Sequence, residues 1–175
     1  MGAKIVPINV EVHRDVFFEM NFEFIRWSHE QILAHHGVDM SQGSDGNARE
    51  YVEQMVDEFL ALEPPAGFVL VLEVDNKVAG MGLIKTIGEG IGEVKRMYIR
   101  PRYRGKGYGH EIMRMLVTRA KELGYSTLRL ETADFMPAAL RVYHSAGFKE
   151  RGEYPRGEVP EWYRPFCIFM EKTLR

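Results

Sequence analysis

The amino-acid sequence predicts a mixed α/β fold, with about seven strands and about four helices in one domain. Three features predict it: apolar residues recur at helical spacing in the first third of the chain, alternate as in strands from Gly67 to Ile99, and then change between the two patterns. The length of 175 residues suits a single domain, residues 1–175, and no linker, repeat or low-complexity segment divides it.

The first third of the chain predicts one short strand and two helices. Residues 4–10 alternate weakly between apolar and polar side chains, which is typical of a strand. Residues 13–36 follow helical spacing, and Gly37 ends the run because glycine readily adopts the left-handed conformation of a helix end. A second helix begins with Asn47 as its cap and ends before Pro64-Pro65.

The middle of the chain predicts three strands. Residues 68–74 and 77–87 have strand chemistry and flank Asp75-Asn76, which favours a two-residue hairpin. A third strand follows at 91–99, and Pro101 ends it because proline cannot continue a central ladder.

The last part of the chain changes between helix and strand. Residues 107–123 carry apolar side chains at intervals of three, four and seven, and Gly124 ends this amphipathic helix. The remaining expected elements are a strand at 126–132, a helix at 136–146 and strands near 147–154 and 165–173.

Composition narrows the class of protein. No stretch approaches the ~18 continuous apolar residues of a membrane span, and the first ten residues lack the apolar centre of a signal peptide, so we expect a soluble, cytoplasmic protein that binds no membrane. Cys167, the single cysteine, lies in an apolar run and is expected to be a buried, inert thiol. His35 and His36 do not predict a metal site, because adjacent helical side chains point about 100° apart.

Charge is distributed unevenly along the chain. Residues 1–92 carry 6 Lys and Arg against 15 Asp and Glu, a net charge of −9, whereas residues 93–175 carry 17 against 10, a net charge of +7. The basic second half favours a polyphosphate ligand. The overall charge of −2, without interleaved aromatic and basic residues, does not favour nucleic-acid binding.

Three alternate glycines, Gly105, Gly107 and Gly109, make residues 104–109 the most informative segment. Glycine tolerates positive φ and has no side chain to keep a ligand away, so successive backbone N–H groups can converge on an anion. The segment follows a predicted strand and opens a predicted helix, whose N-terminal dipole adds to the attraction. We call it the glycine loop, and it predicts phosphate binding.

Two common phosphate-binding motifs do not fit the glycine loop. A P-loop needs Gly-x-x-x-x-Gly-Lys-Ser/Thr, and no Lys followed by Ser or Thr stands after such a loop here. A Rossmann fingerprint needs Gly-x-Gly-x-x-Gly near the start of a βαβ unit, whereas the spacing here is Gly-x-Gly-x-Gly in the middle of the chain.

The glycine loop does match the pattern Arg/Gln-x-x-Gly-x-Gly/Ala, through Arg104, Gly107 and Gly109. A Glu-Val-Lys-Arg-Met-Tyr-Ile strand before it, a Leu-Arg-Leu-Glu strand after it and Gly147-Phe148 extend the match over roughly residues 66–154. In these residues the chain resembles the GNAT acetyltransferase superfamily. The resemblance implies a central, mostly antiparallel sheet with one splayed pair of strands, and an acetyl-CoA-dependent N-acetyltransferase.

The resemblance implies acetyl-CoA as the cofactor and assigns residues to it. The coenzyme A pyrophosphate would be held by the backbone amides of Arg104, Gly105, Lys106, Gly107, Tyr108 and Gly109. Backbone groups of Met97, Tyr98 and Ile99 would pair with pantetheine as an additional strand does, and an N–H among them would polarise the thioester carbonyl.

The resemblance also implies the catalytic residues. Tyr143 stands where the family has its general acid, and a phenol with a pKa near 10 can protonate a thiolate or hydrogen-bond to it. Relatives use a glutamate as base at the position of Glu93 or of Glu131, sometimes through water, and we favour Glu93 slightly. The chain departs from many relatives at Met136, where they have asparagine seven residues before the tyrosine.

Each of these residues also has a purely structural interpretation. Glu93 and Glu131 are equally consistent with strand-edge carboxylates that pair with Lys95 or Arg129. By spacing alone, Tyr143 is a core tyrosine with its hydroxyl at the surface.

The acceptor is the least constrained part of the reaction. Aromatic residues that can line its site occur in the first predicted helix and in the proline-rich segment 154–165. They are Phe17, Phe24, Trp27, Trp162 and Tyr163. The acidic first half fits a small cationic compound, so we expect a small-molecule amine acceptor and direct transfer in a ternary complex.

Two alternatives stay open at this point. One is acetylation of a protein N-terminus or a lysine, which needs an open groove for a peptide. The other is a module that binds acyl-CoA without catalysis. The acyl length, the acceptor's identity and the formation of a homodimer stay open as well.

Overall fold

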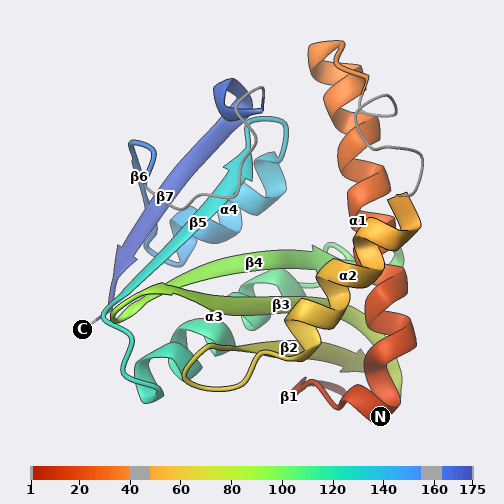
Figure 1. Cartoon of the computed structure of the whole chain (residues 1–175), viewed down its shortest axis with the longest axis vertical. Coiled ribbons are helices and arrows are strands. Elements are labelled where there is room, and N and C mark those ends of the chain that lie inside the picture. The colour runs from red at the N-terminus through yellow and green to blue at the C-terminus, as the bar shows by residue number, and fades with distance from the viewer. Residues whose placement is uncertain (1, 40–47, 155–162, 175) are drawn as a thin grey trace.

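The computed structural model describes residues 2–39, 48–154 and 163–174 (Figure 1). A seven-stranded sheet forms its centre, in the order β1-β2-β3-β4-β5-β7-β6. All neighbouring strands are antiparallel except β4 and β5, which are parallel. The strands are β1 Ala3–Pro7, β2 Gly67–Val74, β3 Lys77–Gly88, β4 Ile91–Ile99, β5 Thr127–Ala133, β6 Lys149–Arg151 and β7 Cys167–Thr173. The predicted mixed α/β class and seven-stranded sheet are confirmed.

Helices cover both faces of the sheet. Helix α1 (Val10–His36) and helix α2 (Ala48–Leu60) lie on one face, and α3 (Tyr108–Glu122) and α4 (Pro137–Ser145) lie on the other (Figure 1). Each face therefore has its own apolar core, one with Leu83 at its centre and one with Leu116. None of the described helices is both long enough and apolar enough to span a bilayer.

Local signals account for the ends of α1. Asn9 caps its first turn, because its side-chain oxygen accepts a hydrogen bond from the Glu11 N–H at 3.0 Å. At the other end Gly37 has φ 68°, and its N–H donates to the Leu33 carbonyl at 3.0 Å. The predicted stop at Gly37 is confirmed, whereas Asn47, the predicted cap of α2, lies outside the described residues.

The hairpin between β2 and β3 forms where the sequence predicts it. Asp75 and Asn76 have φ of 49° and 62°, the pair of positive values that a two-residue turn of the primed type requires. Prediction and structure differ more at β6, which covers 149–151 only, whereas the sequence predicts 147–154. Gly147, with φ 85°, and Phe148 instead form the end of α4's turn.

Glycines in β3 let α3 lie directly against the sheet. A Cβ atom at Gly82 would stand 2.9 Å from Ile112 Cγ2, 2.9 Å from Met97 Sδ and 3.0 Å from Leu116 Cδ1. A side chain at this position would therefore overlap the apolar face of the helix. Because α3 begins at the glycine loop, this contact fixes the loop relative to β4.

The parallel strands β4 and β5 part after four paired positions. Their register runs from Ile91 opposite Thr127 to Val94 opposite Leu130 and then stops, although both strands continue (Figure 1). The pairing of β3 with β4 shifts register between Met81 and Leu83, where Arg96 has φ 55°. This β-bulge bends β4 away from β5. The splayed pair of strands that the resemblance implies is therefore present.

We predict that replacing Gly82 by valine destabilises the fold by about 1–3 kcal/mol, because the larger side chain overpacks the contact between β3 and α3. Chemical denaturation checks the change in the free energy of unfolding. Gly152→Val is a suitable control, because a Cβ at Gly152 meets no described atom within 4 Å. An unchanged stability of Gly82→Val would show that α3 does not depend on this close approach.

Candidate active site

A cleft of about 310 Å³ opens where β4 and β5 part. One wall is α1, through Phe24, Ile25, Ser28, His29 and Ile32. The strands contribute Glu93 to Met97 and Glu131 to Ala133, and α4 contributes Ala139 and Tyr143. The remaining described lining residues are Tyr51, Met136, Tyr163 and Cys167. Residues that are far apart in the sequence thus meet at one gap in the sheet.

Beyond the bulge, β4 presents an edge of main-chain groups to this gap. Tyr98 pairs with Met81 of β3, and the Arg100 N–H donates to the Ala79 carbonyl at 2.9 Å. Because alternate residues of an antiparallel strand direct their N–H and C=O groups to opposite sides, those of Met97 and Ile99 face the gap. An extended ligand can pair with the main chain of Met97 and Ile99, whereas the main chain of Tyr98 is paired with β3.

The glycine loop has the backbone conformation of an anion site. Gly105 and Gly107 have φ of 77° and 82°, and a Cβ atom at either position would meet no described atom within 4 Å. The Arg104 N–H already donates to the Pro101 carbonyl at 3.1 Å. Within the described residues, the N–H groups of 105–109 have no backbone acceptor, as is usual before and in the first turn of a helix. The loop therefore fits a diphosphate.

The side chain of Arg104 lies away from the loop's N–H groups. Its Nε donates to the Ile99 carbonyl at 2.8 Å. Its guanidinium lies over the rings of Tyr98 and Trp27, 5.5 Å and 5.7 Å from their centres. Arg104 therefore holds the segment between β4 and α3 in place. Its hydrogen bond also occupies the Ile99 carbonyl at the open edge of β4.

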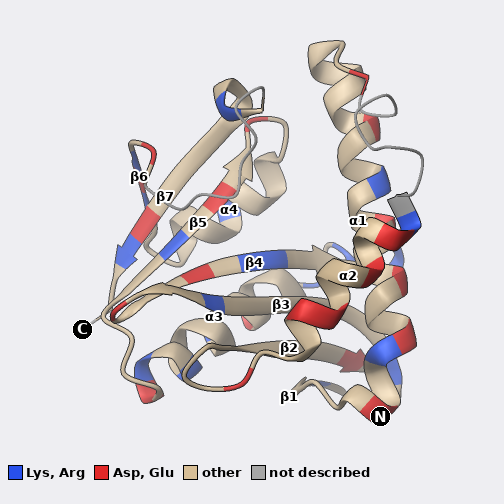
Figure 2. Cartoon of the chain, viewed as in Figure 1, with Lys and Arg blue, Asp and Glu red and all other residues tan. Residues whose placement is uncertain are grey.

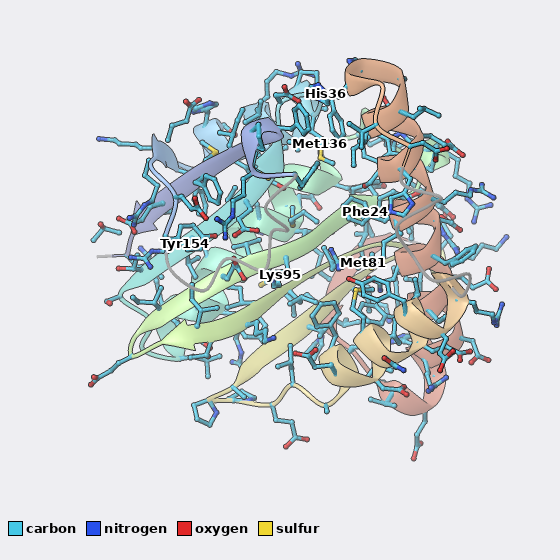
Figure 3. The ribbon with its side chains drawn as sticks, turned by 45° about the horizontal axis from the view of Figure 1, so that its top comes forward. Phe24, His36, Met81, Lys95, Met136 and Tyr154 are labelled. Carbon is cyan, nitrogen blue, oxygen red and sulfur yellow. The ribbon has the colours of Figure 1, made fainter. Side chains whose placement is uncertain are left out.

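Glu93 is fully enclosed; one carboxylate oxygen accepts a hydrogen bond, and the other is in an ion pair without a hydrogen-bond partner among the described residues. The Tyr154 hydroxyl donates to Oε1 at 2.8 Å, and Lys95 Nζ lies 2.8 Å from Oε2. The Glu93 side chain is 1% exposed and that of Lys95 is 12% exposed. Lys95 and Tyr154 lie on the same side of the sheet (Figure 3). Both members of this ion pair line the cleft.

Tyr154 is itself held firmly in place. The guanidinium groups of Arg129 and Arg151 lie 5.1 Å and 5.6 Å from the centre of its ring, and Phe169 meets it edge-on at 5.6 Å. Burial, and next the negative charge of Glu93, raise the pKa of Tyr154 above its usual range. The phenol therefore stays protonated and acts as a permanent donor to Glu93.

Cys167 lines the cleft near Glu131 but has no activated thiol. Burial, and after it the charges of Glu131 and Asp134, raise the pKa of Cys167 to about 12. Burial also raises the pKa of Tyr163, with further contributions from Cys167, Asp134 and Glu131. Cys167 is half-buried rather than buried as the sequence predicted, and the raised pKa is consistent with the expected inert thiol because a protonated thiol is a weak nucleophile.

Tyr143 enters the cleft from α4. It packs edge-on against Phe148, with ring centres 6.3 Å apart, and burial raises its pKa above the usual value of about 10. The phenol is therefore protonated at neutral pH and can donate to an atom in the cleft. Met136 also lines the cleft, and its sulfur accepts a hydrogen bond from Thr132 Oγ1 at 3.8 Å.

Comparison with known proteins shows which family has a chain of this kind. The family model described as "Acetyltransferase (GNAT) family" matches residues 29–148. The chain belongs to the GNAT acetyltransferase family. An uncharacterized N-acetyltransferase of Schizosaccharomyces pombe is 30% identical over 121 residues, which cover 67% of this chain and 74% of that protein. The IAA acetyltransferase of Azospirillum brasilense is 36% identical over 107 residues, 60% of this chain and 67% of that protein.

Solved structures show the same fold. The PaiA N-acetyltransferase of Thermoplasma acidophilum, solved in complex with coenzyme A, superimposes with a TM-score of 0.74 at 19% identity. The match covers 99% of this chain and 99% of the other. The GNAT fold therefore extends over the whole described chain, well beyond the residues that carry the sequence motifs.

The end of α1 is fastened to the far side of the cleft of this GNAT acetyltransferase. A hydrogen bond of 2.9 Å joins His36 Nε2 to Asp134 Oδ1, and the His36 ring stacks on Phe166 with centres 3.9 Å apart. His35 stacks on Phe135 at 5.7 Å. His35 and His36 therefore attach the end of α1 to the segments that follow β5 and precede β7. Among the described residues, no group of three or more His, Cys, Asp or Glu could hold a metal ion.

The structure brings the three predicted catalytic residues and one of the predicted cofactor-binding residues to one cleft. Glu93, Glu131, Tyr143 and Met97 line it. Trp27 and Tyr98 instead line a neighbouring groove of about 620 Å³ together with Arg104. Phe17 lies in the core and Phe24 lines the cleft, while Trp162 lies outside the described residues.

Several residues of the site were not predicted from the sequence, among them Lys95, His29 and Tyr154. Lys95 could have been placed there, since it stands two positions after Glu93 and shares its face of the strand. His29 follows Phe24 and Ile25 along the same face of α1, and burial lowers its pKa, which favours the neutral imidazole. Tyr154 gives no such signal, because its contact with Glu93 spans 61 residues.

We predict that Cys167 plays no covalent part in acetyl transfer. At pH 8 iodoacetamide should label the native thiol about 10³-fold more slowly than the unfolded one, because a pKa near 12 leaves little thiolate. Cys167→Ser should retain activity. Mass spectrometry after incubation with acetyl-CoA checks the same point, and an acetylated Cys167 would contradict it.

Proposed function

We propose that this GNAT acetyltransferase moves an acetyl group from acetyl-CoA to the primary amine of a small molecule, by direct transfer in a ternary complex. The carrying observation is the gap between β4 and β5, where pairing stops after Val94 and Leu130 and a cleft begins. The open edge of β4, the protonated phenol of Tyr143 and the carboxylates of Glu93 and Glu131 all line this cleft. Residues 1–175 act as one domain in this proposal.

The cofactor is assigned to the glycine loop and the edge of β4. The N–H groups of 105–109 bind the pyrophosphate, and the dipole of α3 adds to this attraction. Main-chain groups of Met97 and Ile99 pair with pantetheine, and a Met97 or Ile99 N–H polarises the thioester carbonyl. The coenzyme A complex of the Thermoplasma acidophilum protein supports the assignment, because that protein has the same fold.

The chemistry needs one proton acceptor and one proton donor. The amine nitrogen attacks the thioester carbonyl carbon, a C–N bond forms, the C–S bond breaks, the nitrogen loses a proton and the sulfur gains one. Tyr143 donates to the sulfur. Because its pKa is raised, its main contribution is a hydrogen bond that stabilises the developing thiolate rather than complete proton transfer.

We assign the base to Glu131, acting directly or through water. The initial preference for Glu93 loses support from the geometry, since both of its oxygens have partners and its side chain is 1% exposed. Glu131 lines the cleft from β5, at the first position after the strands part. A carboxylate there can accept the proton of an amine that enters between the strands.

The dimensions of the cleft favour a small acceptor over a peptide. The volume of about 310 Å³ is at the lower end for ligand pockets, and α1 crosses the cleft with Phe24, Ile25 and Ile32. The attachment of His36 to Asp134 closes the far end of α1 against β5. A polypeptide acceptor would need an open groove where these contacts lie.

We predict that acetyl-CoA binds and that amines stimulate release of free thiol. Calorimetry measures the binding, and a thiol reagent measures turnover with a panel of small amines and N-terminal peptides. Turnover of small amines alone supports the proposal. Tight binding without any turnover would favour a non-catalytic acyl-CoA-binding module, and turnover confined to peptides would favour protein acetylation.

We predict that Tyr143→Phe lowers kcat about 10²-fold, the usual contribution of a positioned proton donor, with little change in acetyl-CoA affinity. Because burial raises the pKa of Tyr143, the wild-type enzyme should not lose activity through this group below pH 10. Tyr103→Phe, which removes a hydroxyl outside the cleft, is the matched control. Unchanged kcat in Tyr143→Phe would remove the assigned donor.

A further inference from the structure

Helix α1 crosses the gap between β4 and β5. Near its middle Phe24 lies against β4, since its ring centre is 5.8 Å from that of Tyr98 and 5.7 Å from the Arg96 guanidinium (Figure 3). About two turns later, Ile32 packs against Ala133, the last residue of β5. The residues of α1 between these two contacts therefore lie over the gap itself.

His29 lies in this crossing stretch and lines the cleft. It stands one turn after Ile25 and one turn before Ile32, and both of these residues line the cleft as well. The remaining described lining residues of α1 are Phe24 and Ser28. The α1 wall of the cleft thus carries one imidazole and, within the described lining, no Lys, Arg, Asp or Glu.

The charged groups that face His29 come from the strands, because β4 and β5 both carry acidic and basic side chains (Figure 2). Those that line the cleft are Glu93, Lys95, Arg96 and Glu131. The other titratable lining residues are Tyr51 of α2, Tyr143 of α4, Tyr163 and Cys167. Two acidic and two basic residues sum to no net charge, which agrees with burial as the cause that lowers the pKa of His29.

The imidazole of His29 can accept a proton at neutral pH. Within the described part of the chain it has no hydrogen bond, ion pair or ring contact, whereas Glu93 and Lys95 pair with each other at 2.8 Å. Burial lowers the pKa of His29 below its usual value of about 6.5. The ring is therefore neutral at pH 7, and one of its nitrogens is an acceptor. Because His29 is only half-buried, an accepted proton can pass on to water.

Acetyl transfer to an amine removes two protons from the nitrogen when the amine arrives as a cation. At neutral pH a primary amine is mainly an ammonium, whereas the amide product keeps one hydrogen on nitrogen. One proton must leave before the attack, because an ammonium has no lone pair, and one leaves after the C–N bond has formed. The sulfur gains one proton, so one is released to water overall. Glu131 is assigned to the attacking neutral amine, and the earlier proton needs another acceptor.

We propose that His29 is a further catalytic residue: its imidazole takes the first proton from the ammonium form of the acceptor, and Glu131 then takes the second. The inference rests on the proposed function and adds a residue on the α1 wall of the same cleft. The N–H bond of the ammonium breaks, its electron pair stays on nitrogen, and the proton forms an N–H bond on His29. His29 releases this proton to water before the next turnover.

Paired acceptors of unequal basicity test the proposal. Ethylamine is a cation at pH 7, whereas trifluoroethylamine has nearly the same size, is already neutral and has no first proton to lose. Phenethylamine and its analogue with two fluorines beside the aminomethyl group form a larger pair. Thiol release gives kcat/KM on total amine concentration for the pair whose basic member turns over faster.

Variants of His29 locate the effect. His29→Gln should lower kcat/KM at pH 7 about 10²-fold for the basic amine and leave the fluorinated amine near its wild-type value, because glutamine cannot take up the proton. The ratio of the two cancels losses that affect both acceptors. His35→Gln, which removes an exposed imidazole of α1 outside the cleft, is the matched control. In His29→Ala, the second variant, added imidazole should restore turnover of the basic amine.

The pH dependence gives a separate readout. For the basic amine, wild-type kcat/KM should be nearly level from pH 7 to 9 and fall below pH 6.5, as protonation of His29 removes the acceptor. In His29→Gln it should instead rise about tenfold per pH unit toward the pKa of the amine, near 10, because only amine already neutral in solution then reacts.

The outcomes separate this inference from the proposed function. Equal losses for both members of a pair, or an unchanged ratio in His29→Gln, overturn the role of His29 while acetyl transfer to small amines stands. A wild-type profile that rises toward the pKa of the amine, as expected for the variant, has the same meaning. Acetyl-CoA binding without thiol release from any amine overturns both.

Discussion

The structure depends on a loss of backbone pairing between two neighbouring strands. β4 and β5 share four paired positions and then part, although each continues. Main-chain N–H and C=O groups that lose a strand partner must find another one, from water or from a ligand. The bulge at Arg96, with φ 55°, maintains the separation at a cost of about 1–3 kcal/mol. The gap, the open edge and the cleft all follow from this single interruption.

The buried carboxylate of Glu93 affects both the stability of the fold and the chemistry of the cleft. A buried carboxylate is costly unless it is paired, and here Tyr154 donates a hydrogen bond to one oxygen while Lys95 forms an ion pair with the other. The same contacts that make the charge tolerable also neutralise it, so Glu93 lines the cleft as one half of an ion pair. A residue that the family resemblance offers as a base is thus, in this chain, engaged by two neighbouring side chains.

Local sequence patterns predicted the elements that depend on neighbours in the chain. The strand at 91–99, the glycine loop and the helix end at Gly37 match because dihedral preference and periodicity are local properties. Tyr143 was found through the family pattern, since its spacing alone suggests a core residue. Contacts between distant segments were not predicted: Tyr154 reaches Glu93 across 61 residues, and Cys167 reaches the cleft because β7 lies between β5 and β6.

Helix α1 is attached on both sides of the parting strands. It follows a hydrogen bond between the Ile8 N–H and the Val69 carbonyl of β2, and it ends where His36 meets Asp134 beyond β5. Its 27 residues span about 40 Å as a rigid rod. The helix thus acts as a spacer of fixed length across the gap between β4 and β5. One residue more or fewer would turn His36 about 100° away from Asp134 and remove this attachment, so the contact across the opening depends on the number of residues in one helix.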